Sequence, residues 1–188
     1  MDTKALIANA AYRLLQKKPI TKLTLTEIGH EAGVSKRTVY NHFQDKFEIA
    51  QYLCKQIDDA FFSGEQHSVA EYCGENPLPD SSYISEHADF FRNVLCYVGQ
   101  NSLMDYMAER FLQRLLHDIR MLQGCDEISE EILASAEFFA YSSVYCSYEM
   151  LKGSIPRRYI NTDKSCMNLY MPAPLLNLFT KKQNADTP

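Results

Sequence analysis

The sequence predicts an all-α protein in which an N-terminal three-helix helix-turn-helix domain precedes a C-terminal helical bundle. Apolar residues recur at intervals of three or four along most of the 188 residues, as one face of a helix requires. Helix-capping residues open several of these segments, and glycine or proline closes them. The hydrophobic share of 46% and the charged share of 23% are near the averages of folded domains, so we expect the chain to fold.

The first two helices are predicted over residues 3–16 and from Thr24 to Gly33. The first segment has apolar residues at helical spacing, and Pro19 ends it. Thr24 and Glu27 form a T-x-x-E capping box that opens the second helix. Gly33 ends that helix, because a residue without a Cβ atom enters the left-handed conformation of a sharp turn at little cost.

Two more helix starts follow at once. Ser35 is a good N-cap for a third helix that we expect to run to about Phe43. Asp45 and Glu48 form a second capping box, which opens the fourth helix. Such closely spaced starts predict short helices joined by tight turns.

The third helix is predicted to have an apolar face and a polar face. At about 100° per residue, Val39 and Phe43 share one face, and Arg37 and Asn41 point the opposite way. If the apolar face packs on the first two helices, the polar face is exposed and offers hydrogen-bond donors to DNA bases and phosphates. The arrangement predicts a helix-turn-helix that fits the DNA major groove.

Charge is distributed unevenly along the chain. The net charge is −5, which argues against a protein that coats nucleic acid by electrostatics alone. Residues 1–60 carry nine Lys or Arg against seven Asp or Glu, and residues 61–188 carry ten against seventeen. A positive first third on an acidic remainder indicates a localised footprint for phosphate.

Residues 1–60 resemble the DNA-binding domain of TetR/AcrR-type bacterial regulators. In that family a threonine opens the second helix, and the motifs AGVS and T-x-Y-x-H-F and then a lysine follow. The matching residues here are Thr24, Ala32, Gly33, Val34, Ser35, Thr38, Tyr40, His42, Phe43 and Lys46. Gly29 departs from the pattern, because the family usually has alanine there, and glycine inside a helix costs about 1 kcal/mol relative to alanine.

The resemblance implies a set of DNA-binding residues. Those expected to hold the phosphate backbone are Thr24, Tyr40, His42 and Lys46, and those expected to face base edges are Lys36, Arg37, Thr38 and Asn41. Thr26 can serve either purpose, and Ser35 is included in the surface. The charge of Lys46 adds to the free N–H groups and positive dipole end of the fourth helix. The alternative is that Tyr40 and His42 are ordinary solvent-facing residues.

The remainder, residues 61–188, is predicted to be a second domain, which the resemblance assigns to ligand binding and dimerisation. Residues 63–82 are rich in Gly, Pro and polar residues and are expected to form a loop. Helices are expected over residues 84–98, 102–122 and 130–152. A last one over residues 162–180 is expected to kink at its two prolines, end in a short turn, and fray beyond Lys181.

Aromatic and sulfur-containing residues are frequent in this second domain. Such residues can line an apolar pocket with a few polar groups, although ordinary core packing is the alternative for each of them. The candidates for binding an unknown small-molecule effector are Phe90, Tyr106, Met107, Phe111, Phe138, Tyr141 and Tyr145. The family resemblance implies a homodimer, for which we expect an interface on residues 128–151 and 163–179. A dimer suits a palindromic double-stranded DNA operator, because two recognition helices multiply affinity and specificity.

Several other classes of protein find no support in the sequence. No apolar run approaches the roughly 20 residues that cross a bilayer, and no secretory signal is recognisable, so we expect a cytoplasmic protein without a membrane partner. The six cysteines lack metal-ligand spacing and are expected to be reduced, mostly buried thiols, with no metal site. No catalytic or cofactor motif occurs, so we expect no catalytic residues, no cofactor and no enzymatic activity.

The leading hypothesis is a ligand-responsive transcription regulator, expected to be a repressor. The sign of regulation depends on where the operator lies relative to the promoter, which the residues do not encode. One alternative is a helical small-molecule or protein binding module that does not bind DNA directly. A helical enzyme whose site is assembled only in three dimensions is the other.

Overall fold

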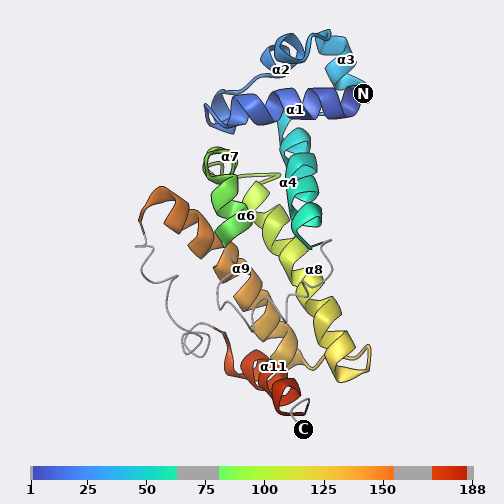
Figure 1. The fold of residues 1–188 in the computed structure, drawn as a ribbon, viewed down its shortest axis with the longest axis vertical. Helices are drawn as coiled ribbons and strands as arrows, with labels where there is room; N and C mark the ends of the chain where they lie inside the picture. The colour runs from blue at the N-terminus through green and yellow to red at the C-terminus, as the bar shows by residue number, and fades with distance from the viewer. Residues whose placement is uncertain (1, 63–80, 155–170, 186–188) are drawn as a thin grey trace. The chain divides into compact units, whose positions relative to one another are not determined.

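The computed structural model of the protein describes residues 2–62, 81–154 and 171–185. Every regular element in these ranges is helical and no strand occurs in them, which confirms the all-α fold class (Figure 1). The helices predicted over residues 3–16 and 130–152 are present as α1 (Thr3–Leu15) and α9 (Glu130–Lys152). Within the described ranges, no helix combines the length and the apolar character needed to cross a bilayer.

The helix-turn-helix consists of α2 (Leu25–Ala32) and α3 (Lys36–Tyr40), preceded by a short 3-10 helix, η1 (Ile20–Lys22). The predicted capping box is present, because Thr24 Oγ1 accepts from the Glu27 backbone N–H and the Glu27 carboxylate accepts from the Thr24 backbone N–H. Gly33 ends α2 in the left-handed conformation, with φ 68°. These local predictions are confirmed.

Gly29 lies where α2 and the following turn come close together. A Cβ atom on this residue would lie 3.0 Å from the Val34 carbonyl oxygen and 3.3 Å from Val39 Cγ2. The Val34 backbone N–H donates to the Gly29 carbonyl oxygen at 2.9 Å. The absence of a side chain therefore permits close packing of α3 on α2, at a position where glycine has a low helix propensity.

The third helix is shorter than predicted, since α3 ends at Tyr40 instead of near Phe43. The Phe43 backbone N–H nevertheless donates to the Val39 carbonyl oxygen at 3.0 Å. This helical hydrogen bond keeps the two apolar side chains on one side of the chain, so the early end of α3 does not change which residues face the core.

The fourth helix, α4 (Lys46–Phe62), begins with the predicted cap. The Asp45 carboxylate accepts from the Glu48 backbone N–H at 2.8 Å. The Glu48 carboxylate accepts from the Gln44 backbone N–H, one residue before the position that a regular capping box would use. Carboxylates therefore occupy two backbone N–H groups near the start of α4, where the sequence had suggested free ones.

The chain divides into two compact units. Among the described residues, the first unit holds 2–60 and 83–106, and the second holds 61–62, 81–82, 107–154 and 171–185. Residues 83–106, which the sequence division at residue 60 placed with the C-terminal domain, lie in the same compact unit as the helix-turn-helix, and α7 packs on α1. The helix α8 (Leu103–Gln123) begins in the first unit and continues into the second.

The single helix predicted over residues 84–98 is two helices, α6 (Ser81–Glu86) and α7 (Ala88–Leu95). Between them, His87 has φ −111° and ψ 26°, outside the helical region. Its Nδ1 atom lies 2.6 Å from the hydroxyl oxygen of Tyr12 on α1. The break coincides with this contact between segments distant in sequence, which local spacing does not predict.

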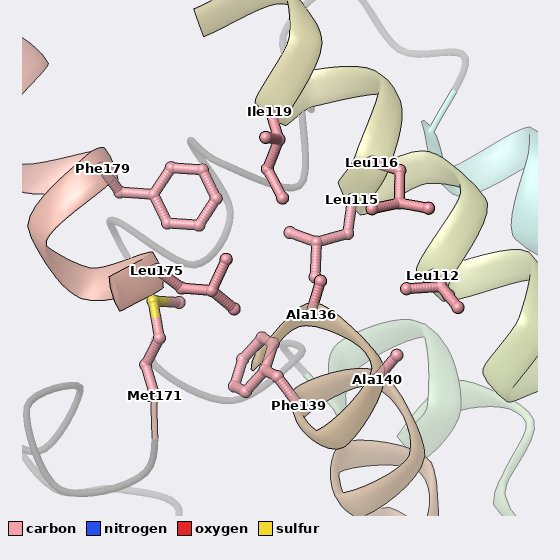
Figure 2. Close-up of a cluster of buried hydrophobic side chains, with 10 residues drawn as sticks. All are labelled: Leu112, Leu115, Leu116, Ile119, Ala136, Phe139, Ala140, Met171, Leu175 and Phe179. Carbon is pink, nitrogen blue, oxygen red and sulfur yellow. The ribbon is translucent and has the colours of Figure 1, made fainter. Parts of the chain in front are cut away.

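The second unit contains a core formed by α8, α9, α11 (Ala173–Ala185) and Met171, which lies just before α11. Figure 2 shows their apolar side chains pointing toward one another. The members of this cluster are Leu112, Leu115, Leu116, Ile119, Ala136, Phe139, Ala140, Met171, Leu175 and Phe179.

The end of the chain differs from the prediction of a kink, a short turn and a frayed tail. Pro172 precedes α11 and Pro174 lies in its first turn, where a helix needs no backbone N–H donor, so both prolines are compatible with an uninterrupted helix that extends beyond Lys181. The predicted part at residues 162–170 lies outside the described residues, as does most of the predicted loop at 63–82.

The cysteines correct the prediction of mostly buried thiols. Of the four in the described ranges, Cys54 is buried, Cys146 is half-buried, and Cys96 and Cys125 are exposed. None of these four is in a disulfide bond. The other two, Cys73 and Cys166, lie outside the described residues.

Candidate nucleic-acid interface

The short helix α3 has the orientation that the sequence predicts. Val39 is 0% exposed and Phe43 is 2% exposed, so both side chains belong to the core. Lys36, Arg37 and Asn41 are exposed. Burial of the apolar face therefore presents the polar residues of α3 to solvent, as a helix that enters a DNA groove requires.

The first turn of α3 is held by its own side chains. Ser35 Oγ accepts from the Thr38 backbone N–H at 3.0 Å and lies 2.8 Å from Thr38 Oγ1. Ser35 is exposed and Thr38 is half-buried. The two hydroxyl groups fix the helix start, and they lie beside the exposed basic residues.

Lys36 and Tyr40 lie one helical turn apart on the same exposed surface. The Lys36 ammonium is 5.7 Å from the centroid of the Tyr40 ring, and 52% of Tyr40 is exposed. A cation over an aromatic face is attracted by the ring quadrupole. His42, which follows α3, is half-buried.

The start of α2 presents a polar surface that includes an acidic residue. Thr24 and Thr26 are exposed, and Thr24 Oγ1 donates to the Glu27 carboxylate at 2.9 Å. The Lys18 ammonium also donates to this carboxylate, at 2.5 Å. The hydrogen bonds from Lys18 and then from Thr24 lower the pKa of Glu27 below its ordinary value, so the carboxylate is ionised near neutral pH.

Lys46 makes contacts that the sequence did not predict. Its ammonium donates to the carbonyl oxygens of Thr21 at 3.2 Å and Leu23 at 3.0 Å. The residue is half-buried. Lys46 therefore ties the start of α4 to the connection between η1 and α2, in addition to any role toward phosphate.

Lys4 is a further residue of this unit that the sequence analysis missed. Its ammonium lies 5.1 Å from the ring centroid of Phe43 and 5.0 Å from that of Tyr52, and these two rings are themselves in edge contact at 5.6 Å. Lys4 thus connects the first turn of α1 with the residues that follow α3. No local pattern indicates this contact, because its partners lie far away in the sequence.

The seven candidate pocket residues differ in burial, and they do not all lie in the same unit. Phe90 is fully buried in the first unit, where its ring contacts Tyr12 at 5.2 Å and Phe91 at 5.3 Å. Half-buried positions are found for Tyr106, Met107 and Phe111, and exposed ones for Phe138, Tyr141 and Tyr145. Phe111 packs beside the core of the second unit, with its ring 6.0 Å from that of Phe139.

Comparison with known proteins identifies the N-terminal part. Residues 7–53 match the family model described as bacterial regulatory proteins, tetR family. The chain is 34% identical over 130 residues to the probable HTH-type transcriptional regulator ArpR of Pseudomonas putida, which covers 69% of this chain and 57% of ArpR. Over 79 residues it is also 34% identical to the HTH-type transcriptional repressor BepR of Brucella suis, covering 41% of this chain and 36% of BepR.

A solved structure supports the fold of the whole chain. The crystal structure of a tetR-family transcriptional regulator from Streptomyces coelicolor matches with a TM-score of 0.59 at 15% identity, covering 100% of this chain and 92% of that one. The chain matches less than two thirds of the length of the curated relatives ArpR and BepR. The relatives named here are described as regulators, and none of them is described as an enzyme. Residues 7–53 of the chain therefore form a domain of the tetR family of bacterial regulatory proteins.

Proposed function

We propose that the protein is a ligand-responsive repressor that binds a palindromic DNA operator as a homodimer. The orientation of α3 is the observation that supports this most directly. Val39 and Phe43 are buried, and Arg37 and Asn41 on the opposite face are exposed. A helix built in this way can lay its polar face in the major groove without uncovering its core contacts.

The polar face supplies groups that suit base edges. An arginine can donate two hydrogen bonds to guanine, and an asparagine can pair with adenine. We assign these roles to Arg37 and Asn41, with Lys36 and Thr38 beside them. Thr26, exposed on the first turn of α2, is assigned either to a base or to a phosphate.

The phosphate contacts are assigned to residues around this face: Thr24, Ser35, Tyr40, His42 and Lys46. Hydroxyl, imidazole and ammonium groups hold phosphate oxygens and fix the position of a protein on the duplex without reading sequence. The negative charge of Glu27 lies close to Thr24, and its ion pair with Lys18 reduces the repulsion that a phosphate would meet there. Because the proposed partner is chromosomal DNA, we place the protein in the cytoplasm.

The proposed dimer interface lies on α9. Phe138 is 67% exposed, Tyr141 46% and Tyr145 54%, and their spacing of three and four residues puts them on one face of that helix. We name these three residues the α9 stripe. Neighbouring exposed aromatic residues favour a protein partner, and a second copy of the chain supplies one with the same stripe. We therefore assign the α9 stripe to the dimer interface in preference to the effector pocket.

The proposed effector site retains two half-buried candidates of the second unit, Met107 and Phe111, which lie one helical turn apart on α8. A methionine and a phenylalanine on one face of a helix provide an apolar lining, which suits a small, largely apolar molecule. Phe90 is assigned to the core, because its ring is fully buried against Tyr12 and Phe91. The effector would change the operator affinity by favouring one separation of the two recognition helices.

The test of DNA binding begins with duplexes that the protein selects from a random-sequence library. The logarithm of the binding constant should fall linearly with the logarithm of salt concentration, by about 0.9 for each phosphate contact. Arg37→Ala should lower affinity for the selected duplex about tenfold and relax the sequence preference at one position of each half-site. Binding is measured by fluorescence anisotropy.

Lys55→Ala is the matched control, because Lys55 is exposed on α4 and forms an ion pair with Asp59 at 2.5 Å. It should leave the sequence preference unchanged. The proposal fails if no duplex is selected at low salt. It fails equally if both substitutions weaken binding without any change in preference, since Arg37 would then supply only charge. Either result would favour a binding module that does not read DNA.

A further inference from the structure

The residue Tyr97, which follows α7, contacts the start of α4. Its ring centroid lies 4.6 Å from that of Phe47, with an angle of 33° between the ring planes. Both residues are half-buried and belong to the first unit. Aromatic rings in such close tilted contact attract each other beyond the effect of the area they bury. The contact therefore restrains the first turn of α4.

Phe47 is adjacent to Lys46, and Lys46 reaches the connection before α2. The Lys46 ammonium lies 5.5 Å from the Phe47 ring centroid and donates to the carbonyl oxygens of Thr21 and Leu23. The next residue is Thr24, the N-cap of α2. A continuous series of contacts thus leads from Tyr97 to the first turn of α2, and we name it the Tyr97 relay.

Tyr97 is held on its other side by the segment that leads into α8. A Cβ atom on Gly99 would lie 2.6 Å from the Tyr97 hydroxyl oxygen and 2.9 Å from Cζ, so the tyrosine ring lies directly over that glycine. The Ser102 hydroxyl donates to the Tyr97 carbonyl oxygen at 3.5 Å. Ser102 immediately precedes α8, which continues out of the first unit. The start of α8 and the position of Tyr97 are therefore linked.

The segment before Tyr97 is itself anchored to α1. The Asn93 side-chain amide donates to the Leu15 carbonyl oxygen at 2.8 Å, at the last turn of α1. The Tyr12 hydroxyl lies 2.6 Å from His87 Nδ1. These contacts fix α7 against α1, so Tyr97 extends from a held segment and its ring can set the position of Phe47.

We propose that Tyr97 is a positioning residue for the DNA-binding surface and that it acts through Phe47 and Lys46 on the first turn of α2. Displacement of the Tyr97 ring releases Lys46 from the carbonyl groups that it holds and loosens Thr24 and Thr26. Because α8 starts six residues after Tyr97 and a short connection links them, a change at the start of α8 reaches α2 by this route, which passes through the first turn of α4. The inference rests on the proposed function, since it concerns how that surface is held.

The experiment compares Tyr97→Leu, Tyr97→Phe and the wild type in two measurements. The first is amide hydrogen exchange of peptides that cover residues 20–32, in the DNA-free protein. The second is the affinity for the duplex that the wild type selects from a random-sequence library. Tyr97→Leu should raise the exchange rate and lower the affinity, each about threefold to tenfold, as expected for loss of one aromatic pair. Tyr97→Phe keeps the ring and should restore both.

Gly99→Ala provides an independent variant, because the added Cβ atom would displace the Tyr97 ring without removing it. It should also raise the exchange rate, and this effect should largely vanish in the Tyr97→Leu background. Val98→Ala is the matched control at a neighbouring position that is 85% exposed, and it should change neither measurement.

The possible outcomes separate the relay from the proposed function. If Tyr97→Leu leaves exchange at residues 20–32 unchanged while circular dichroism shows an intact fold, the relay is refuted. If Tyr97→Leu raises the exchange rate but the rate in Tyr97→Phe does not return to the wild-type value, a role of the ring contact is refuted as well. If the wild type selects no duplex, DNA binding is refuted, and the exchange data alone decide whether Tyr97 positions α2.

Discussion

The two exposed helical faces of this protein differ in chemistry. On α3 and in the turn after it, the apolar residues Val39 and Phe43 are buried, and the exposed side chains are basic or polar except for the ring of Tyr40. On α9, the buried face is apolar apart from Ser143 and Ser147, yet the opposite side exposes the aromatic α9 stripe. An exposed basic face suits a polyanion, and an exposed aromatic face suits an apolar protein surface. This difference is the reason for the two proposed partners, DNA for α3 and a second copy of the chain for α9.

The largest expected effect is the difference between a buried and an exposed ring near α3. Phe43→Ala removes a ring that is 2% exposed and contacts Tyr52, and it should lower the free energy of unfolding by about 3 to 5 kcal/mol. Tyr40→Ala removes a ring that is 52% exposed, and it should change stability by less than about 0.5 kcal/mol while weakening DNA binding. Urea denaturation measures the stability difference. Equal losses of stability would show that the orientation of α3 is wrong.

The next effect concerns the α9 stripe. Phe138→Glu places a charge on the proposed dimer interface, and the dimer should weaken by about 2 kcal/mol or more, because a buried unpaired carboxylate is costly. Loss of the dimer should also reduce operator affinity, since one recognition helix contacts only half of a palindrome. Sedimentation equilibrium measures the association constant.

Met121→Glu is the control for this substitution, because Met121 is 72% exposed on α8 and lies outside the α9 stripe. It should leave the association constant unchanged. If the Phe138→Glu protein remains dimeric, the α9 stripe is not the dimer interface. The aromatic residues of α9 would then have to serve another partner.

A smaller effect is expected for Lys4, the residue that connects α1 with the end of the α3 segment. Lys4→Met keeps the aliphatic stem and removes the charge over the rings of Phe43 and Tyr52, so stability should fall by about 0.5 to 1 kcal/mol. Lys4→Arg keeps the charge and should retain most of this stability. Thermal unfolding measures the change, with Lys17→Met, at an exposed lysine just beyond α1, as the control. An equal loss in both methionine variants would rule out a specific interaction with the rings.

The distance in sequence between contacting residues decides which features of the structure the sequence predicts. The capping box of Thr24 and Glu27 and the turn at Gly33 depend on residues within a few positions of one another, and they were predicted correctly. The contacts of Lys46 and Tyr97 join segments more than twenty residues from their partners, so no local pattern indicates them. On α9 the problem is different, because the adjacent residues Phe138 and Phe139 have the same chemistry and only the packing shows that one is exposed and the other buried.

The smallest effect tests Glu27, the acidic residue in the first turn of α2, beside the proposed phosphate contact Thr24. Hydrogen bonds from Lys18 and Thr24 lower the pKa of Glu27 below its ordinary value of 4.5. A group whose pKa is lowered by folding stabilises the folded state above its unfolded pKa, and this contribution is lost as the pH falls through the folded pKa. Glu27→Gln removes the titrating group and still allows the side chain to accept from the Thr24 backbone N–H.

The wild type should therefore be more stable than Glu27→Gln near neutral pH, and the difference should shrink as the pH falls below 4.5. Urea denaturation over that pH range measures it. Lys18→Met should remove most of the same pH dependence, because Lys18 is the main cause of the lowered pKa. A difference that stays constant with pH would show that the carboxylate acts only as a helix cap. The ion pair with Lys18 would then not offset the negative charge of Glu27 toward a DNA phosphate, and Thr24 would be a poor phosphate contact.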